Sequence, residues 1–232
     1  AGGGIINTTG SGNRRTFTMP AGKVEIRATF SRIVSSFPDW SDSSSGASSH
    51  WTDPSQTAIQ GVPRPGASQQ LFYDVPIGHW AAGEISWANQ MGYMNGDRWG
   101  VFDPDGTMTF QQMWMVLARV NGYWPSSMED AKRWAVEGGF AEGANPTTAI
   151  TRHQMVTALF RCARLMGNMN NNYASLAGYT DSRTVPASAR NAMEWAVANG
   201  IIGGTSNGRL EPNQTITRAQ FAVILYRFGQ RV

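Results

Sequence analysis

A motif that recurs three times after residue 71 constrains this chain more than any other feature of its sequence. When Trp87, Trp134 and Trp195 are aligned, each copy has alanine one position later and glycine five and nine positions later. The first of these glycines fits the position just after a helix, where φ is positive, and an apolar residue follows it as such helix ends require. Each copy therefore predicts a first helix that ends at this glycine. We expect its tryptophan to pack in the core or between copies rather than to stack on a sugar.

A second block in each copy begins with an apolar residue and a threonine. The three threonines are Thr109, Thr151 and Thr217. A glutamine follows each one three positions later, which is the pattern of a capping box at a helix start. Apolar side chains then occur four, seven, eight and eleven positions after the threonine, and this spacing is that of one helical face. The residues eight positions after each threonine are Leu117, Leu159 and Leu225.

Each copy thus predicts a helix, a glycine-rich loop and a second helix. One such unit cannot bury its apolar face alone, so the three should pack around a shared core. We predict a mainly α fold of three helix-loop-helix repeats, at 71–122, 123–168 and 169–229. The interval from tryptophan to threonine is five residues shorter in the second unit than in the other two. The second unit is therefore a shortened repeat.

The first 33 residues have a different pattern. From Val24 to Phe30, apolar and polar residues alternate as in a half-buried strand, and Thr16–Met19 fits a hairpin partner. Two strands alone are marginal in water, so we predict that residues 1–33 are a remnant of a β domain. These strands should be disordered alone or paired with another sheet, including that of a neighbouring copy.

Residues 34–70 are rich in Ser, Pro, Gly and Gln and show no periodicity, so we interpret them as a linker. The sequence opens with Ala-Gly-Gly-Gly, without Met or a signal peptide. We therefore interpret the chain as a piece of a longer protein.

Composition excludes several functions. The net charge is +3 and the basic residues are scattered, so the basic stripe of a nucleic-acid-binding protein is missing. No apolar run approaches the roughly 18 residues of a membrane span. Cys162 is the single cysteine, so no internal disulfide or zinc cluster can form, and its position in the repeat predicts a buried apolar role. No catalytic motif surrounds the three histidines, and Asp103–Gly106 fits a turn rather than a calcium loop. We expect no catalytic residues, no cofactor and no metal.

Residues 71–229 resemble the S-layer homology domain family. The first unit carries Phe72-Tyr73-Asp74-Val75, His79-Trp80-Ala81 and Phe102-Asp103-Pro104, and the later units carry Ile150-Thr151-Arg152 and Ile216-Thr217-Arg218. The second unit lacks the opening Phe-x-Asp-Val. The resemblance implies a pseudo-threefold arrangement and a non-catalytic, extracellular anchor in the bacterial cell wall. It also implies binding to an anionic, often pyruvylated, secondary cell-wall polysaccharide. The Thr16–Phe30 stretch resembles the closing strands of β repeats in Gram-positive surface proteins.

Arg152 and Arg218 are the main candidates for the polysaccharide site. Each follows a capping threonine, where a cation is unfavourable by about 0.3–1 kcal/mol because the helix N-terminus is already positive. Free N–H groups and a guanidinium together would hold a carboxylate. The alternative is an ion pair with a carboxylate of the adjacent unit. Phe110 takes this position in the first unit, which leaves ligand binding there in question.

Other residues complete the candidate site. Thr151 and Thr217 lie beside the two arginines. Trp80 and Trp99 have no counterparts in the other units, and Trp80 in particular is a candidate for contact with a sugar.

A second function remains open, namely a structural subunit. In that case the repeats and the N-terminal strands would make protein–protein contacts in an S-layer-like lattice or a surface filament. Open grooves lined by Arg152 and Arg218 would favour the anchor. Pairing of residues 14–30 with strands of a neighbouring chain would favour the lattice.

Overall fold

The computed structural model describes residue 66 and residues 69–141 and 145–231. The chain divides into two compact units, Ala1–Asp39 and Trp40–Val232, and every described residue lies in the second. The predicted β remnant at 1–33 lies outside the described residues, as does nearly all of the predicted linker at 34–70. Both therefore stay predictions.

The described residues are mainly helical, as the sequence predicts. The six α-helices among them are α1 (Ala82–Gln90), α2 (Phe110–Val120), α3 (Met128–Glu137), α4 (Arg152–Leu165), α5 (Arg190–Ala198) and α6 (Arg218–Gly229). Two short 3-10 helices, η2 (Ser182–Thr184) and η3 (Ala187–Ala189), precede α5. We refer to α1 and α2 as the first helix pair, to α3 and α4 as the second pair, and to α5 and α6 as the third pair.

The glutamine half of each predicted capping box is present at the starts of α2, α4 and α6, and at α6 the Thr217 hydroxyl also accepts from Gln220 N. The N–H groups of Thr109, Thr151 and Thr217 donate to the Oε1 atoms of Gln112, Gln154 and Gln220 over 2.9, 2.8 and 3.0 Å. These bonds fix where each helix begins.

A closed ring of backbone hydrogen bonds joins the segments that lead into these three helices. Met108 N donates to Ile216 O (2.9 Å), Ile216 N donates to Ile150 O (3.2 Å), and Ile150 N donates to Met108 O (2.8 Å). All three residues are almost completely buried. Each segment thus supports the next, and the starts of α2, α4 and α6 meet at one centre.

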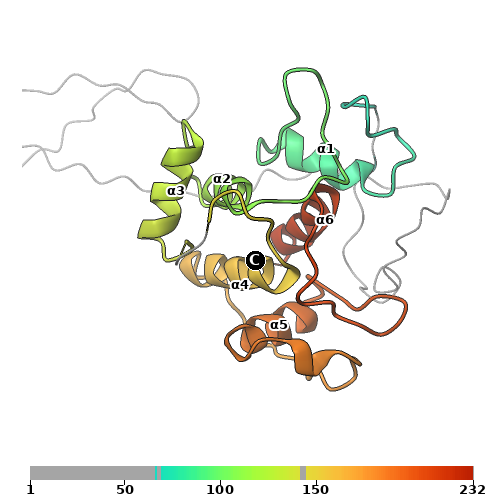
Figure 1. Cartoon of the computed structure of the whole chain (residues 1–232), viewed down its shortest axis with the longest axis vertical. Coiled ribbons are helices and arrows are strands. Elements are labelled where there is room, and N and C mark those ends of the chain that lie inside the picture. The colour runs from blue at the N-terminus through green and yellow to red at the C-terminus, as the bar shows by residue number, and fades with distance from the viewer. Residues whose placement is uncertain (1–65, 67–68, 142–144, 232) are drawn as a thin grey trace, which may run out of the picture. The chain divides into compact units, whose positions relative to one another are not determined.

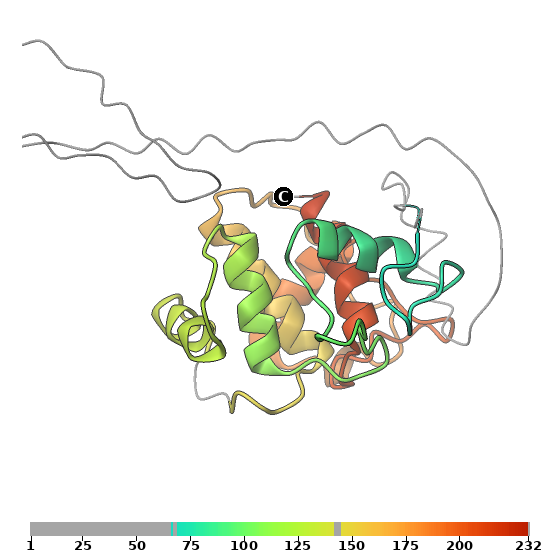
Figure 2. The same ribbon diagram turned by 90° about the horizontal axis from the view of Figure 1, so that it is seen from above.

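The helices pack in the same cyclic order. The second helix of one pair packs on the first helix of the next: α2 on α3, α4 on α5, and α6 on α1. Figure 1 shows α3, α5 and α1 outside the central α2, α4 and α6, and Figure 2 shows the same helices from above. The contact of α6 with α1 closes the circle between the last helix and the first.

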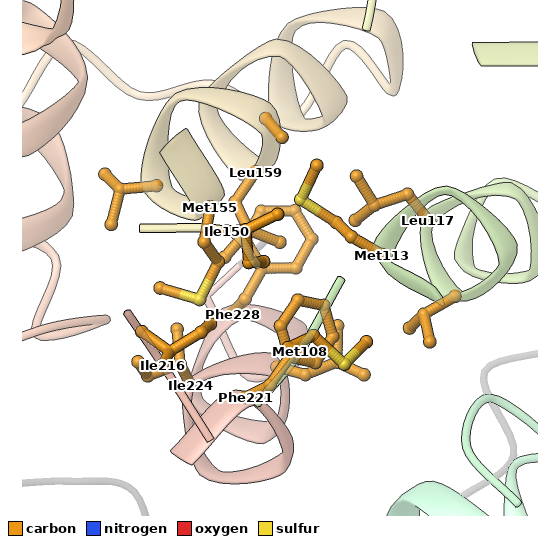
Figure 3. Packing of buried hydrophobic residues seen from close by; sticks show 14 of the residues in the cluster. Met108, Met113, Leu117, Ile150, Met155, Leu159, Ile216, Phe221, Ile224 and Phe228 are labelled. Carbon is orange, nitrogen blue, oxygen red and sulfur yellow. The ribbon is translucent and has the colours of Figure 1, made fainter. Parts of the chain in front are cut away.

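The shared core lies between α2, α4 and α6. Figure 3 shows Met113, Leu117, Leu159 and Phe228 pointing toward one another from these three helices. The three equivalent leucines, Leu117, Leu159 and Leu225, are each at most 1% exposed. Their predicted equivalence is confirmed.

The repeated tryptophans pack on protein, as expected. Trp87 of α1 meets Tyr226 of α6 edge to face, with ring centroids 5.1 Å apart. Trp195 of α5 meets Phe160 of α4 in the same manner at 5.4 Å. Trp134 stacks on Phe140 within the second pair. The edge-to-face pairs bind α1 and α5 to the central helix of the preceding pair.

In the first and third pairs, an aspartate carboxylate accepts hydrogen bonds from the loop between the two helices. Asp74 accepts hydrogen bonds from the N–H groups of Phe102 (2.9 Å) and Asp103 (2.6 Å). Asp181 accepts from Leu210 and Glu211, both over 2.8 Å. These aspartates belong to the opening motif that the second unit lacks. The unit with the shorter loop is therefore also the unit that lacks this aspartate.

Replacing Asp181 by alanine is expected to reduce the free energy of unfolding by about 1–3 kcal/mol, because two backbone N–H groups lose their charged acceptor. Asp181 is only 6% exposed, so water replaces the carboxylate poorly. Urea denaturation of the full chain measures the change, and Asp105→Ala, at an exposed position, is the control. Equal stability of the two variants would contradict this role.

Cys162 is completely buried in α4, as its position in the repeat predicts. Burial raises the pKa of its thiol to about 12, and the hydrogen bond from Asn121 Nδ2 to its Sγ (3.2 Å) opposes this only in part. Thiolate is the reactive form, so we expect the folded chain to resist alkylation at pH 8. Iodoacetamide labelling followed by mass spectrometry measures this. Rapid labelling without denaturant, at a rate equal to that in guanidinium chloride, would contradict it.

Candidate functional site

The N-terminal N–H groups of the three central helices bond to the loop of the next pair. In α4, Arg152 N donates to Gln214 O and His153 N to Pro212 O, each over 2.9 Å. In α6, the N–H groups of Arg218 and Ala219 donate to the carbonyl oxygens of Gly106 and Pro104. In α2, the N–H groups of Phe110 and Gln111 donate to the carbonyl oxygens of Thr148 and Pro146. The expectation of free N–H groups at these helix starts is therefore wrong. Any anion there must be held by side chains.

Arg152 lies at the interface between the second and third pairs. Its side chain is buried, with 5% of the residue exposed, and its Nη2 donates to Gly203 O over 2.8 Å. Gly203 belongs to the loop that follows α5. The guanidinium therefore ties the start of α4 to this loop.

Arg218 lies at the equivalent interface between the third and first pairs. Its Nε donates to Phe102 O (2.7 Å) and its Nη2 to Asn95 O (2.9 Å), while its guanidinium lies 4.6 Å from the ring centroid of Phe102. Burial lowers the pKa of Arg218, and the nearby Asp103 and Asp74 oppose that shift. Within the described part of the chain, Nη1 of Arg218 makes no hydrogen bond. This side chain is only half-buried and keeps donor capacity that the fold does not use.

The interface between the first and second pairs has no arginine at this position. Phe110 occupies it, with its ring 5.9 Å from that of Trp114. The loop that this residue faces, which contains Pro146 and Thr148, is the shortened one. The guanidinium and the full-length loop are therefore absent from the same interface.

A second set of arginines, ten residues after each capping threonine, has a different role. Arg119 of α2 donates through Nη1 to Tyr93 O over 2.9 Å, and Arg161 of α4 donates to Gly139 O. Each acceptor lies just beyond the C-terminal end of the first helix of the same pair. A cation at this end is favourable because the helix C-terminus carries partial negative charge. The recurrence in the sequence signals these arginines, but it does not indicate their acceptors.

The remaining predicted residues lie near these interfaces. Thr151 and Thr217 are the N-caps of α4 and α6. Trp80 is half-buried just before α1, with its ring 5.5 Å from that of His79. Burial lowers the pKa of His79, while Asp105 and Asp74 oppose the shift. Because Asp74 also acts on Arg218, the first-pair segment that carries Trp80 shares its electrostatic surroundings with the start of α6.

The structure therefore divides the predicted site residues between two interfaces. Arg152 and Thr151 meet the loop of the third pair, and Arg218 and Thr217 meet the loop of the first pair. Among residues 69–141 and 145–231, no three side chains of His, Cys, Asp or Glu gather in a way that suits a metal ion. None of the described helices has the length and apolar character needed to cross a membrane.

Comparison with protein families gives two matches. Residues 71–113 and 178–222 match the model of the S-layer homology domain. These segments contain α1 with the start of α2, and α5 with the start of α6. They include Trp80, Thr217 and Arg218.

Comparison with individual proteins gives relatives of two kinds. The chain is 36% identical over 111 residues to the surface-layer 125 kDa protein of Lysinibacillus sphaericus, covering 44% of this chain and 9% of that protein. It is 26% identical over 196 residues to an S-layer protein of Bacillus thuringiensis subsp. finitimus, covering 75% of this chain and 24% of that protein. It is 25% identical over 104 residues to an amylopullulanase of Thermoanaerobacterium thermosulfurigenes, covering 45% of this chain and 6% of that protein. The chain thus spans less than a quarter of the length of each relative.

Proposed function

Because this chain carries S-layer homology segments and is thereby a cell-surface protein associated with the bacterial wall, we propose that it anchors a larger protein by binding an anionic secondary wall polysaccharide. The proposal concerns the ligand and the residues that bind it. The remainder of the larger protein is a separate question.

The proposal is based on the guanidinium of Arg218, because the fold uses only some of its hydrogen-bond donors. Two of its nitrogens hold carbonyl groups of the first-pair loop, which fixes the side chain in one position. Its third nitrogen, Nη1, keeps its donor capacity. A fixed cation that is partly shielded from water binds a carboxylate more strongly than a mobile surface cation does. An acidic sugar, such as a pyruvylated one, supplies the carboxylate.

Thr217 and Trp80 complete the proposed site at this interface. Thr217 lies next to Arg218 and uses its hydroxyl to accept from Gln220 N over 3.2 Å. Its hydroxyl hydrogen remains able to bond a sugar oxygen. Trp80 offers an aromatic surface on which a pyranose ring can stack.

Arg152 and Thr151 form the second proposed site, which is less open. Because Arg152 is almost completely buried, a ligand reaches it only if the loop around Gly203 shifts. We therefore assign the larger share of the binding energy to Arg218. The interface at Phe110 lacks a cation and is assigned no ligand.

The proposed module is non-catalytic. This chain matches an S-layer protein over 75% of its length and a protein named as an amylopullulanase over 45%, so the two matches overlap. A segment that occurs both in a surface-layer protein and in an enzyme does not account for the catalytic activity of the enzyme alone. A shared attachment to the wall fits both of them.

A structural role in a lattice is the second candidate, and the names of the S-layer relatives favour it. It requires contacts between copies, for which the predicted N-terminal strands are the candidates. Analytical ultracentrifugation of the full chain without glycan distinguishes the two functions. A monomer at micromolar concentration favours the anchor, and concentration-dependent assembly favours the lattice.

The proposed function is tested by co-sedimentation with purified bacterial wall sacculi. We expect the full chain to sediment with native sacculi and to stay in solution after acid extraction has removed the secondary polysaccharide. Equal sedimentation with both preparations would indicate that peptidoglycan itself is bound, and the proposal would be wrong.

A further inference from the structure

Two of the most exposed aromatic side chains lie on backbone segments that a hydrogen bond joins: Trp99 on the loop of the first pair, and Tyr73 on the segment before α1. Trp99 is 68% exposed and Tyr73 is 82% exposed. A single exposed aromatic residue is normal on a protein surface. Tyr73 and Trp99 are 26 residues apart in the sequence, and the fold brings their backbone segments side by side.

The turn that carries Trp99 is held rigidly by Asp97. The Oδ1 atom of Asp97 accepts from Trp99 N (2.8 Å) and Val101 N (3.0 Å), and Asp97 N donates to Val101 O (2.8 Å). The backbone on either side of Trp99 is thus fixed. The indole is presented to solvent from an ordered turn.

Gly100 joins Tyr73 to this turn. Tyr73 N donates to Gly100 O over 2.9 Å, and the phenol ring lies against Gly100 so closely that a Cβ atom there would come within 3.0 Å of it. Gly100 also has a φ of 77°, which favours glycine. The close approach of the Tyr73 ring and the positive φ therefore both depend on glycine at position 100, next to Trp99.

Arg98 places its positive charge over one face of the indole. Its guanidinium carbon lies 4.8 Å from the Trp99 ring centroid, and its side chain is exposed. Among the described residues, Arg98 has no carboxylate partner. An exposed aromatic pair with an adjacent unneutralised cation is complementary to a ligand that has both an apolar ring face and a negative group.

We propose that Trp99, Tyr73 and Arg98 form a second carbohydrate-binding surface, which we call the Trp99 platform, for a pyranose that carries a carboxylate. The apolar face of the sugar stacks on the indole and phenol rings, and Arg98 binds the carboxylate. Because the platform is already ordered, binding costs little conformational entropy. This inference rests on the proposed function, since it assigns the same polysaccharide a second contact, on the loop whose Asn95 and Phe102 carbonyl groups Arg218 binds.

The platform is tested with an oligosaccharide released from purified secondary wall polysaccharide. We expect Trp99→Ala to weaken its binding about fivefold to tenfold, as the loss of an aromatic stacking contact does. The control is Trp124→Ala, which removes another exposed indole (48% exposed) that packs on Gly92 outside the platform. Circular dichroism checks the fold of both variants.

Nuclear magnetic resonance of the indole N–H groups gives a direct readout. The signal lost in Trp99→Phe identifies Trp99, and we expect it to shift on addition of the oligosaccharide. If the wild type binds but this signal and the affinity of Trp99→Ala are unchanged, the platform is wrong and the proposed function stands. If the wild type does not bind, both are wrong. If Trp99→Ala instead abolishes self-association of the chain, the surface binds a second copy, and the carbohydrate assignment is overturned.

Discussion

Replacing Leu159 by alanine is expected to lower the free energy of unfolding by about 2–5 kcal/mol. Leu159 is 1% exposed and projects from α4 into the space between the three central helices (Figure 3). Because α2 and α6 are held in place by the backbone ring at their starts, the core cannot collapse fully into the space that the leucine leaves. A residual cavity then adds to the lost transfer free energy.

Leu165→Ala is the matched control, since it makes the same change on the same helix at a residue that is 62% exposed. We expect its stability to stay within about 0.5 kcal/mol of the wild type. Urea denaturation followed by circular dichroism measures both variants. A loss below 1 kcal/mol for Leu159→Ala would contradict the shared core.

Replacing Arg218 by alanine is expected to weaken binding to purified acidic wall polysaccharide tenfold or more. A charge-assisted hydrogen bond is worth roughly 1.5–3 kcal/mol, and about 1.4 kcal/mol corresponds to a factor of ten. Arg218→Lys should also lose much of the binding, because one ammonium cannot donate to Phe102 O, Asn95 O and a carboxylate in the geometry of a planar guanidinium. We expect Arg152→Ala to have the smaller effect of the two sites, since that side chain is buried.

Arg119→Ala separates binding from folding. It removes the same charge and a comparable bond to a backbone carbonyl, that of Tyr93, but it lies in the last turn of α2 rather than at the start of α6. Calorimetry should give it the affinity of the wild type. If the folded double variant of Arg152 and Arg218 also binds as tightly as the wild type, both arginines are structural and the site assignment is wrong.

The sequence predicts the start of each central helix and its buried face. Both features are local: Thr217 and Gln220 are three residues apart, and Leu225 follows from the helical period. A capping box and an amphipathic face leave a side-chain pattern that one chain displays without an alignment. The sequence therefore indicates the elements and much of the core.

The order in which the helices pack was beyond the sequence. The ring that joins Met108, Ile150 and Ile216 consists of backbone N–H and carbonyl groups, and these leave no mark on the side-chain pattern. The contact of α6 with α1 likewise joins residues more than 120 positions apart. Long-range pairing of this kind follows only from the folded chain.

For the candidate site, the sequence indicates residues but not their partners. The arginine positions were indicated by an unfavourable cation at a helix start, but the sequence did not reveal that the adjacent N–H groups are bonded to Gly106 and Gln214. It also did not indicate that both guanidinium groups hold loop carbonyls. The acceptors belong to other helix pairs, so they cannot be predicted from the spacing of nearby residues in the sequence.

Recognition of an acidic wall polysaccharide is tested by one calorimetric titration. The full chain is titrated with purified secondary wall polysaccharide before and after chemical removal of its acidic groups, at the same ionic strength. We expect saturable binding to the intact polymer and at least tenfold weaker binding to the neutral one. Equal affinity for the two polymers, or no binding to either, would contradict it.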